Sequence, residues 1–338
     1  MHLMEKDKHV NILMIDSPQV NYVEHGEFDG LRDDGCKIKV TRTPTPAQLS
    51  WADGIVAFHS VKIDNALLAQ TSRCRALVKA TTGVDDVDMV ALRGKGIRFA
   101  NIGHVGVEEV AEHSLALVLL AQRRLLDYFR HTRRGGWCWR EHGAQVPSGP
   151  PKPCHETVLG LLGYGAIGQA VARRAAVFGY QVKFHDSALT YCPNGFAQAC
   201  SFEALLAQSD IVSIHLPLSL ATHHLLNERS LARFKPGAAL VNTSRGGLID
   251  TDSLLRALDS GQLGQALLDV VEHEPEVPPA LREHARVALT PHAAFYSHRS
   301  LSTLKERALR TLLTMLEGGP SVTAGNGWSY DQEGDAHV

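Results

Sequence analysis

Three side chains that exchange protons or bind anions follow short apolar runs in the second half of the chain. Arg245 lies in "LVNTSRGG", Glu274 in "LLDVVEHEP" and His292 in "VALTPHAAFYS". Each run is predicted to be a strand, and parallel strands place their carboxyl ends at one edge of a sheet, where α/β proteins usually bind ligands. Taken singly, the three residues are explained equally well as a turn residue, a loop acid and a core histidine. Their common position predicts a reaction site.

A second motif predicts a nucleotide beside that edge. Gly163-x-Gly165-x-x-Gly168 lies between the apolar run "TVLGLL" and a helical stretch, and Asp186 ends the next predicted strand, 18 residues after Gly168. The glycines permit a tight turn, close approach of a pyrophosphate and packing of helix on strand, and the helix N-terminus attracts phosphate. Asp186 favours the ribose hydroxyls of NAD over the 2′-phosphate of NADP, and Ser187 after it is not an arginine.

The elements that position these residues alternate between strands and helices, which is typical of parallel α/β sheets. A helix is expected from Val107 to about Arg130, apolar on nearly every side of its centre, so it must be buried in a domain junction or against a second subunit. The polar, glycine-rich residues 321–338 are expected to form a flexible tail. Strands are expected at 10–16, 54–58, 75–80, 97–101 and at five or more later runs.

Composition excludes several classes of function. The formal net charge of -2 gives no electrostatic reason to expect nucleic acid or an acidic membrane as the main partner. The first residues, "MHLMEKDKHVNILMID", lack the layout of a signal peptide, and no apolar run spans a bilayer, so a cytoplasmic protein is expected. The six cysteines form no C-x-x-C pair, so disulfides are not expected. The eighteen histidines, His223 and His224 among them, are scattered along the chain and do not predict a metal site.

The sequence resembles a known enzyme family over most of its length. "LVNTSRGGLID", "ALLDVVEHEP" and "LTPHAA" are together similar to the D-isomer-specific 2-hydroxyacid dehydrogenases, from about Arg75 to Gly318. "HAAFYS" and "HHLLNERSL" look most like the branch that contains the C-terminal-binding proteins, which are NAD-binding transcriptional co-repressors. The resemblance implies a Rossmann-type NAD-binding domain at 104–294, inserted in a smaller flavodoxin-like α/β substrate domain made of 1–103 and 295–320. It also implies a homodimer built on the helix near 107–130.

The resemblance also implies a mechanism. NADH gives a hydride to the carbonyl carbon of a small 2-oxo acid, and His292, as imidazolium, protonates the carbonyl oxygen. Glu274 accepts the other ring N–H, which fixes the tautomer and favours the charged ring. Arg245 binds the carboxylate and the carbonyl oxygen with its forked donors. Arg245, Glu274 and His292 are therefore the expected catalytic residues.

The family's binding positions carry over onto two further sets of residues. The cofactor is expected to contact Gly106, Gly163, Gly165, Ala166, Ile167, Gly168, Asp186, His215, Leu216, Pro217, Thr222, Thr243, Ser244, Asp269, His292 and Ala294. The substrate is expected to contact His59, Thr82, Gly83, Arg245 and Phe295.

The sequence departs from the family pattern near the substrate. Thr81 stands where the family usually has glycine, and Gly103 where it has proline, which changes the loop "KATTGVDDVD" expected to hold the substrate carboxylate. His59 and Lys62 occupy a stretch where phosphoglycerate-type members carry arginines. A substrate without a phosphate ester is therefore expected, because a histidine cannot replace a bidentate arginine on a phosphate.

Two alternatives to a 2-oxo acid reductase remain open. One is an NAD(H)-sensing binding protein of the co-repressor kind, in which catalysis is secondary; residues 1–75 show no recognisable peptide-binding groove. The other is an enzyme that oxidises an inorganic anion or reduces a phosphonate analogue, which would need only altered contacts in the substrate domain.

Overall fold

The chain folds into two compact units. The computed structural model describes residues 9–17, 22–23, 35–59, 61–103, 105–137, 150–320 and 329–330. The first unit contains Met1–Val105 and Ser297–Val338, and the second contains Gly106–Tyr296. From the sequence these divisions are expected after residues 103 and 294. Each unit has buried apolar clusters of its own.

The first unit is built on a twisted sheet in the order β13-β5-β4-β3-β1-β2. Its strands pair in parallel except β13, which pairs antiparallel with β5. Without β13 the order is 2-1-3-4-5, which is that of flavodoxin-like sheets and confirms the expected fold. The elements are β1 (Val10–Ile15), β2 (Cys36–Thr41), α1 (Pro46–Trp51), β3 (Gly54–Ala57), α2 (Asn65–Ala69), β4 (Ala76–Lys79), α3 (Met89–Gly94), β5 (Arg98–Asn101), α12 (His298–Leu316) and β13 (Ser329–Tyr330).

Two strands of this unit were not expected from the sequence. β2, "CKIKVT", lies at the sheet edge beside β1 and buries only Cys36 and Ile38, so its apolar signal is weak. β13 lies inside the segment expected to be a flexible tail, and its Ser329 and Tyr330 pair with Ala100 and Phe99 of β5. The open edge of β5 offers backbone groups with which these two residues pair, and the flexibility of the tail stays a prediction. The other residues of 321–338 lie outside the described part.

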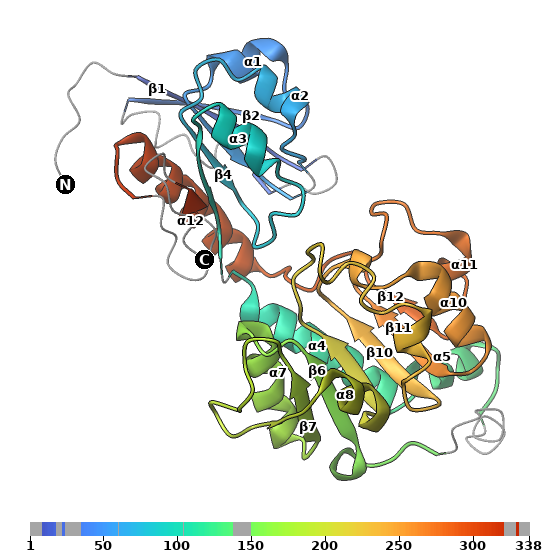
Figure 1. Ribbon diagram of the computed structural model, residues 1–338. Coiled ribbons are helices and arrows are strands. Elements are labelled where there is room, and N and C mark those ends of the chain that lie inside the picture. Colours follow the sequence, from blue (N-terminus) through green and yellow to red (C-terminus); the bar gives the residue numbers. More distant parts are fainter. Residues whose placement is uncertain are drawn as a thin grey trace. The chain divides into compact units, whose positions relative to one another are not determined.

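The helix α12 completes the first unit from the C-terminal side of the chain (Figure 1). Ser297 and Ser300 form a capping box at its start, and its buried face packs on β3, β4 and β5. The fit is close: a Cβ atom added at Gly54 of β3 would lie 2.9 Å from a methyl carbon of Leu316. Arg98 donates to the carbonyl of Met315 at 2.6 Å. The first unit is therefore complete only when the chain returns to it.

The second unit has the sheet order β12-β11-β10-β9-β6-β7-β8, with all its strands parallel. Numbered from β6, this is the 3-2-1-4-5-6 order of Rossmann folds with one more strand, which confirms the expected fold. The elements are α4 (Val107–Gln122), α5 (Leu125–Arg133), η2 (Cys154–Glu156), β6 (Val158–Leu162), α7 (Ala166–Val177), β7 (Gln181–His185), β8 (Gln198–Ala199), α8 (Phe202–Gln208), β9 (Ile211–Ile214), α9 (Glu228–Leu231), β10 (Ala238–Asn242), η3 (Gly246–Leu248), α10 (Thr251–Asp259), β11 (Leu263–Leu268), α11 (Pro279–Arg282) and β12 (Val287–Leu289).

The single helix expected from Val107 to Arg130 is two helices. α4 ends at Gln122, Arg124 adopts a left-handed conformation with φ 53°, and α5 begins at Leu125. The break lets α5 dock on β11 and β12: Gln265 donates to Asp127 at 3.1 Å, and Arg130 donates to the carbonyl of Val287. These contacts compensate for a backbone conformation that is unfavourable for arginine.

α4 is buried along one side within its own unit, and not all round as expected. Leu117 and Val118 are 8% and 0% exposed, and they pack in a cluster with β6, β7 and α7. A partner subunit is therefore not required to bury this inner side, whereas Ala116 is exposed and Leu119 and Leu120 are half-buried.

No helix in the described ranges is both long and apolar enough to cross a membrane. Within these ranges Cys74, Cys154, Cys192 and Cys200 are free thiols.

Candidate active site

The ends of three neighbouring strands carry the three expected catalytic residues. Arg245 follows β10, Glu274 follows β11 and His292 follows β12. β10 pairs with β11 and β11 with β12, all in parallel, so the three segments leave the sheet at the same edge. The topology therefore places Arg245, Glu274 and His292 as the sequence predicts.

His292 and Glu274 form the direct contact at the centre of this edge. Nδ1 of His292 lies 2.6 Å from Oε2 of Glu274, and the two side chains are 22% and 30% exposed. The other carboxylate oxygen accepts the backbone N–H of Val271 at 3.0 Å, which fixes the carboxylate. With Nδ1 turned toward Glu274, Nε2 is the nitrogen that can exchange a proton with a ligand.

The turn that carries His292 is held by a buried acid. Asp269 is 2% exposed, and its carboxylate accepts the hydroxyl of Thr290 and the backbone N–H groups of Ala293 and Ala294. The backbone N–H of His292 donates to the carbonyl of Asp269 at 2.8 Å. The turn is tight, since His292 itself has a left-handed φ of 52°. Asp269 was expected to contact the cofactor, whereas its visible contacts position His292.

Arg245 lies in a turn packed against the segment that leads to Glu274. Its guanidinium donates to the carbonyl of Ser244 at 2.8 Å, and its own carbonyl accepts from Asn242. The next residue, Gly246, lies so close to that segment that an added Cβ would be 1.9 Å from the carbonyl carbon of Val271. The arginine turn and the Glu274 segment are therefore in contact through their backbones.

The glycine turn has the shape that a dinucleotide requires. Gly163 has a φ of 96°, and a Cβ there would lie 2.5 Å from the carbonyl oxygen of His215. A Cβ at Gly168 would lie 2.4 Å from the carbonyl oxygen of Gly163, while one at Gly165 would meet nothing within 4 Å. The first and third glycines are thus required by packing, and the second leaves room for a pyrophosphate. α7 begins at Ala166 without a side-chain cap, so its first N–H groups face that space.

Asp186 stands at the end of β7, where a ribose would lie. Its two carboxylate oxygens accept the backbone N–H groups of Tyr164 at 2.7 Å and Ala188 at 2.9 Å. Tyr164 is fully buried, and its ring stacks on Phe184. Asp186 therefore supports the glycine turn in addition to offering acceptors to ribose hydroxyls.

His215 follows β9, which lies beside β6 where the strand order reverses. Among the described residues neither of its ring nitrogens has a hydrogen-bond partner, although both are buried. Burial lowers the pKa of this imidazole to about 4, so the ring is neutral near pH 7. Buried polar atoms without protein partners at the reversal point fit a site that binds a dinucleotide. The residues present therefore fit a dinucleotide.

The other expected cofactor residues lie around the same edge. Thr243 shares a hydrogen bond with Ser114 of α4 at 2.7 Å, and Ser244 donates to the carbonyl of Ile214, so both hydroxyls support the local fold. Thr222 closes its own turn by donating to the carbonyl of Pro217. A methyl carbon of Leu216 would lie 3.1 Å from a Cβ at Gly163, and Ile167 lies in the first turn of α7.

Two residues near the ends of the second unit contact one another. Gly106, with a φ of 78°, is the N-cap residue of α4, and a Cβ there would lie 3.2 Å from Cβ of Phe295. The ring of Phe295 stands edge-on to that of His292, with centroids 6.5 Å apart. Phe295, expected at the substrate, therefore lies beside the expected proton donor.

The remaining expected substrate residues belong to the first unit. Thr82 and Gly83 follow β4: Asn101 donates to the carbonyl of Thr82 at 2.6 Å, and Thr81 donates to the carbonyl of Gly83 at 2.7 Å. The threonine found in place of the usual glycine thus gives this loop an internal hydrogen bond. His59 follows β3 and is half-buried. Their contact with a substrate stays a prediction.

Lys79 was not singled out from the sequence. It is 1% exposed at the end of β4, and its ammonium contacts the carbonyl of Val61 and, at 2.6 Å, the carboxylate of Asp86. Because Asp86 follows Thr82 and Gly83 in the same loop, the half-buried ion pair fixes the loop against the sheet. The sequence did carry a signal for this residue: a lysine stands at the end of an apolar run that is predicted to be a strand.

The family model for the NAD-binding domain of the D-isomer-specific 2-hydroxyacid dehydrogenases matches residues 115–294, more than half of the chain. The chain belongs to this family. It is thus an NAD-dependent dehydrogenase, and its second unit contains the family's NAD-binding domain. The expected family and cofactor are confirmed, while the expected likeness to the co-repressor branch stays a prediction.

Relatives within the family agree with this assignment over most of the chain. A glyoxylate reductase of Thermococcus litoralis is 32% identical over 270 residues, which are 79% of this chain and 81% of the relative. A glyoxylate reductase of Korarchaeum cryptofilum is 32% identical over 310 residues, covering 87% and 88% of the two chains. The crystal structure of D-lactate dehydrogenase from Aquifex aeolicus, complexed with NAD and lactic acid, has a TM-score of 0.79 at 26% identity and covers 91% and 96%.

Proposed function

We propose that this dehydrogenase reduces a small 2-oxo acid that carries no phosphate ester, of the size of glyoxylate or pyruvate. The observation that carries the proposal is the contact of His292 with Glu274 at the strand edge that also holds Arg245 and the glycine turn. The names of the relatives, glyoxylate reductase and D-lactate dehydrogenase, support a substrate of this size.

The chain's own residues have distinct parts in the reaction. When bound, NADH supplies the hydride that adds to the carbonyl carbon. His292 donates the proton on Nε2 to the carbonyl oxygen, and Glu274 keeps the ring oriented and stabilises its charged form. Arg245 binds the carboxylate and the carbonyl oxygen through its forked donors. The product is a 2-hydroxy acid, and His292 is left as neutral imidazole.

A panel of 2-oxo acids tests the proposal directly. Purified protein with NADH is expected to reduce glyoxylate, pyruvate or hydroxypyruvate with a higher kcat/KM than phosphohydroxypyruvate, because His59 is a poor phosphate ligand. Phenylpyruvate, oxaloacetate and phosphonopyruvate complete the panel. A preference for phosphohydroxypyruvate would contradict the substrate class. NADH binding without turnover of any oxo acid would instead support the NAD(H)-sensing alternative.

We also propose that NAD is preferred to NADP because of Asp186. The double variant Asp186→Ser, Ser187→Arg is expected to narrow or reverse this preference, measured as the ratio of kcat/KM values with NADH and NADPH. Its kcat/KM with NADH is also expected to fall, because the glycine turn loses the acceptor for the N–H of Tyr164. Ser187→Arg alone is the control and keeps the preference for NADH. A wild-type protein that used both cofactors equally would contradict this role of Asp186.

A homodimer is proposed as the working assembly. Support comes from α5 and the residues that follow it, where Phe129 and Trp137 are 52% and 92% exposed. Aromatic side chains are enriched at subunit interfaces relative to the rest of the surface. Sedimentation at micromolar concentration is expected to give the mass of a dimer, and a monomer would contradict the proposal. Leu117 is a poor site for a disrupting charge, because it belongs to the core of its own unit.

A further inference from the structure

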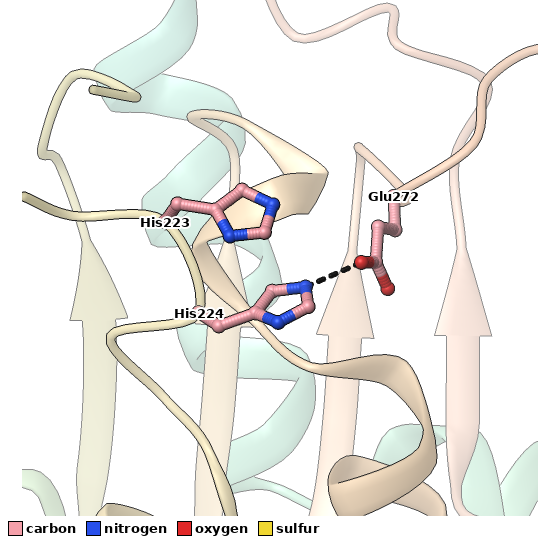
Figure 2. Close-up of side chains that lie close together, drawn as sticks. All are labelled: His223, His224 and Glu272. Atoms are coloured by element: carbon pink, nitrogen blue, oxygen red, sulfur yellow. Dashed lines mark hydrogen bonds and ion pairs between the residues drawn. The ribbon is translucent and has the colours of Figure 1, made fainter. Parts of the chain in front are cut away.

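Three metal-binding side chains that the proposed reaction does not use lie together in the second unit. His223 and His224 belong to the loop after β9, and Glu272 follows β11 (Figure 2). One nitrogen of each imidazole and one carboxylate oxygen lie within 4.8 Å of one another. The histidine pair is visible in the sequence, but its partner is 48 residues further along the chain, and no metal site was expected.

Glu272 is held ready to present one oxygen to this cluster. Its Oε2 accepts the hydroxyl of Thr251 at 2.7 Å and the backbone N–H of Thr251 at 3.3 Å, while Oε1 contacts Nε2 of His224. The two bonds from Thr251 hold one oxygen of the carboxylate, so the other oxygen is directed at the histidines. An outer hydrogen bond of this kind is how proteins orient a carboxylate that binds a metal ion.

The histidine loop is shaped so that both rings reach the same carboxylate. The two rings stack with centroids 3.9 Å apart, and both lie on the side of the loop that faces Glu272 (Figure 2). Consecutive side chains of an extended chain would point to opposite sides. His224 has a left-handed φ of 50°, which changes that direction. Its backbone N–H donates to the carbonyl of Gly247 at 2.9 Å, and its carbonyl accepts from Asn227 at 3.0 Å.

We propose that His223, His224 and Glu272 bind one divalent transition-metal ion of the Zn²⁺ class. Two imidazoles and one carboxylate are the donors that Zn²⁺, Co²⁺ and Ni²⁺ accept, whereas Mg²⁺ and Ca²⁺ prefer oxygen ligands alone. The ion replaces the direct contact between His224 and Glu272, and His223, which is exposed, turns its ring to supply the third ligand. Water completes the coordination.

The site is tested by titrating the whole chain with metal ions. The protein carries no histidine tag, and bound metal is first removed with a chelator, which is then removed in turn. Calorimetry with Zn²⁺ is expected to show one ion bound per chain, and Co²⁺ is expected to give visible absorption bands that Zn²⁺ abolishes. His223→Asn should weaken Zn²⁺ binding at least tenfold, about the loss that removing even an outer-shell partner causes. Because His223 lies outside the His224–Glu272 pair, this variant should fold, which circular dichroism checks. Glu272→Gln removes the anionic ligand at constant size and should also weaken binding.

A second histidine beside a carboxylate provides the matched control. Nε2 of His284 lies 3.3 Å from Asp259, and His284 belongs to no metal-binding group found among the described residues. His284→Asn should bind Zn²⁺ as tightly as the wild type. Three results would each overturn the proposal. They are the absence of saturable Zn²⁺ binding, an equal affinity of His223→Asn and wild type for Zn²⁺, and the binding of several ions to the same extent by every variant. The last result would assign the metal to scattered surface histidines.

Discussion

Replacing His292 by glutamine is expected to lower turnover of 2-oxo acids by roughly 10²- to 10⁴-fold, the usual contribution of a positioned acid. NADH binding should stay nearly unchanged, because the glycine turn and Asp186 lie at other strand ends. Steady-state kinetics and NADH fluorescence titration measure the two effects separately. A variant with wild-type turnover would remove His292 from the chemistry and leave its contact with Glu274 as a structural one.

Glu274→Gln is the companion measurement. The amide keeps the shape and can still accept from Nδ1 of His292, but it removes the negative charge 2.6 Å from the ring. Turnover should therefore fall, because the positive charge that the ring carries as a proton donor loses its stabilising partner. Wild-type turnover in this variant would show that the negative charge is not needed for the reaction.

Gly246→Ala is expected to be as damaging as loss of a catalytic group, although glycine has no side chain to react. The new Cβ would lie 1.9 Å from the carbonyl carbon of Val271 and 2.4 Å from the backbone N of Glu272. Backbone atoms cannot turn aside as a flexible side chain can, so the Arg245 turn or the Glu274 segment must shift. A misplacement of about 1 Å can cost 10²-fold in rate. We expect kcat/KM to fall by at least about 10²-fold.

Gly247→Ala is the matched control for this effect. Its Cβ would lie 3.2 and 3.4 Å from the two methyl carbons of Leu218 and 3.7 Å from Cδ2 of His223. These are side-chain atoms, and the leucine can move by a few tenths of an ångström. Thermal unfolding of both variants separates a displaced site from a lost fold. If the two variants had equal kcat/KM, the close approach of Gly246 to Val271 would not matter for the reaction.

The parts of the fold that could be predicted from the sequence are those with strong local signals. β6, the glycine turn and α7 combine apolar run, glycine spacing and helical pattern in one short stretch, and Asp186 then follows from the position of β7. The order of β10, β11 and β12 follows from the alternation of strands and helices. The placement of Arg245, Glu274 and His292 depends on that order alone, so it was predictable without knowledge of any side-chain contact.

The parts that could not be predicted depend on contacts between distant residues. Nothing local marks Arg124 as a helix break; its left-handed conformation is stable because α5 gains contacts with β11 and β12. Asp269 resembles a cofactor ligand by position, yet its bonds to the turn at 290–294 appear only when β11 and β12 lie side by side. His224 and Glu272 are likewise joined only through the sheet.

The return of α12 to the first unit has a consequence for how the chain folds during synthesis. The second unit is one continuous segment, Gly106–Tyr296, and can fold once that segment has left the ribosome. The first unit needs α12, whose Leu312 and Leu316 lie over Gly54, more than 250 residues earlier in the chain. Contacts of such long sequence separation form slowly because a large loop must close first. The β1–β5 sheet therefore stays partly uncovered until α12 has been synthesised, so its apolar surface is exposed to the solvent for longer than that of the second unit.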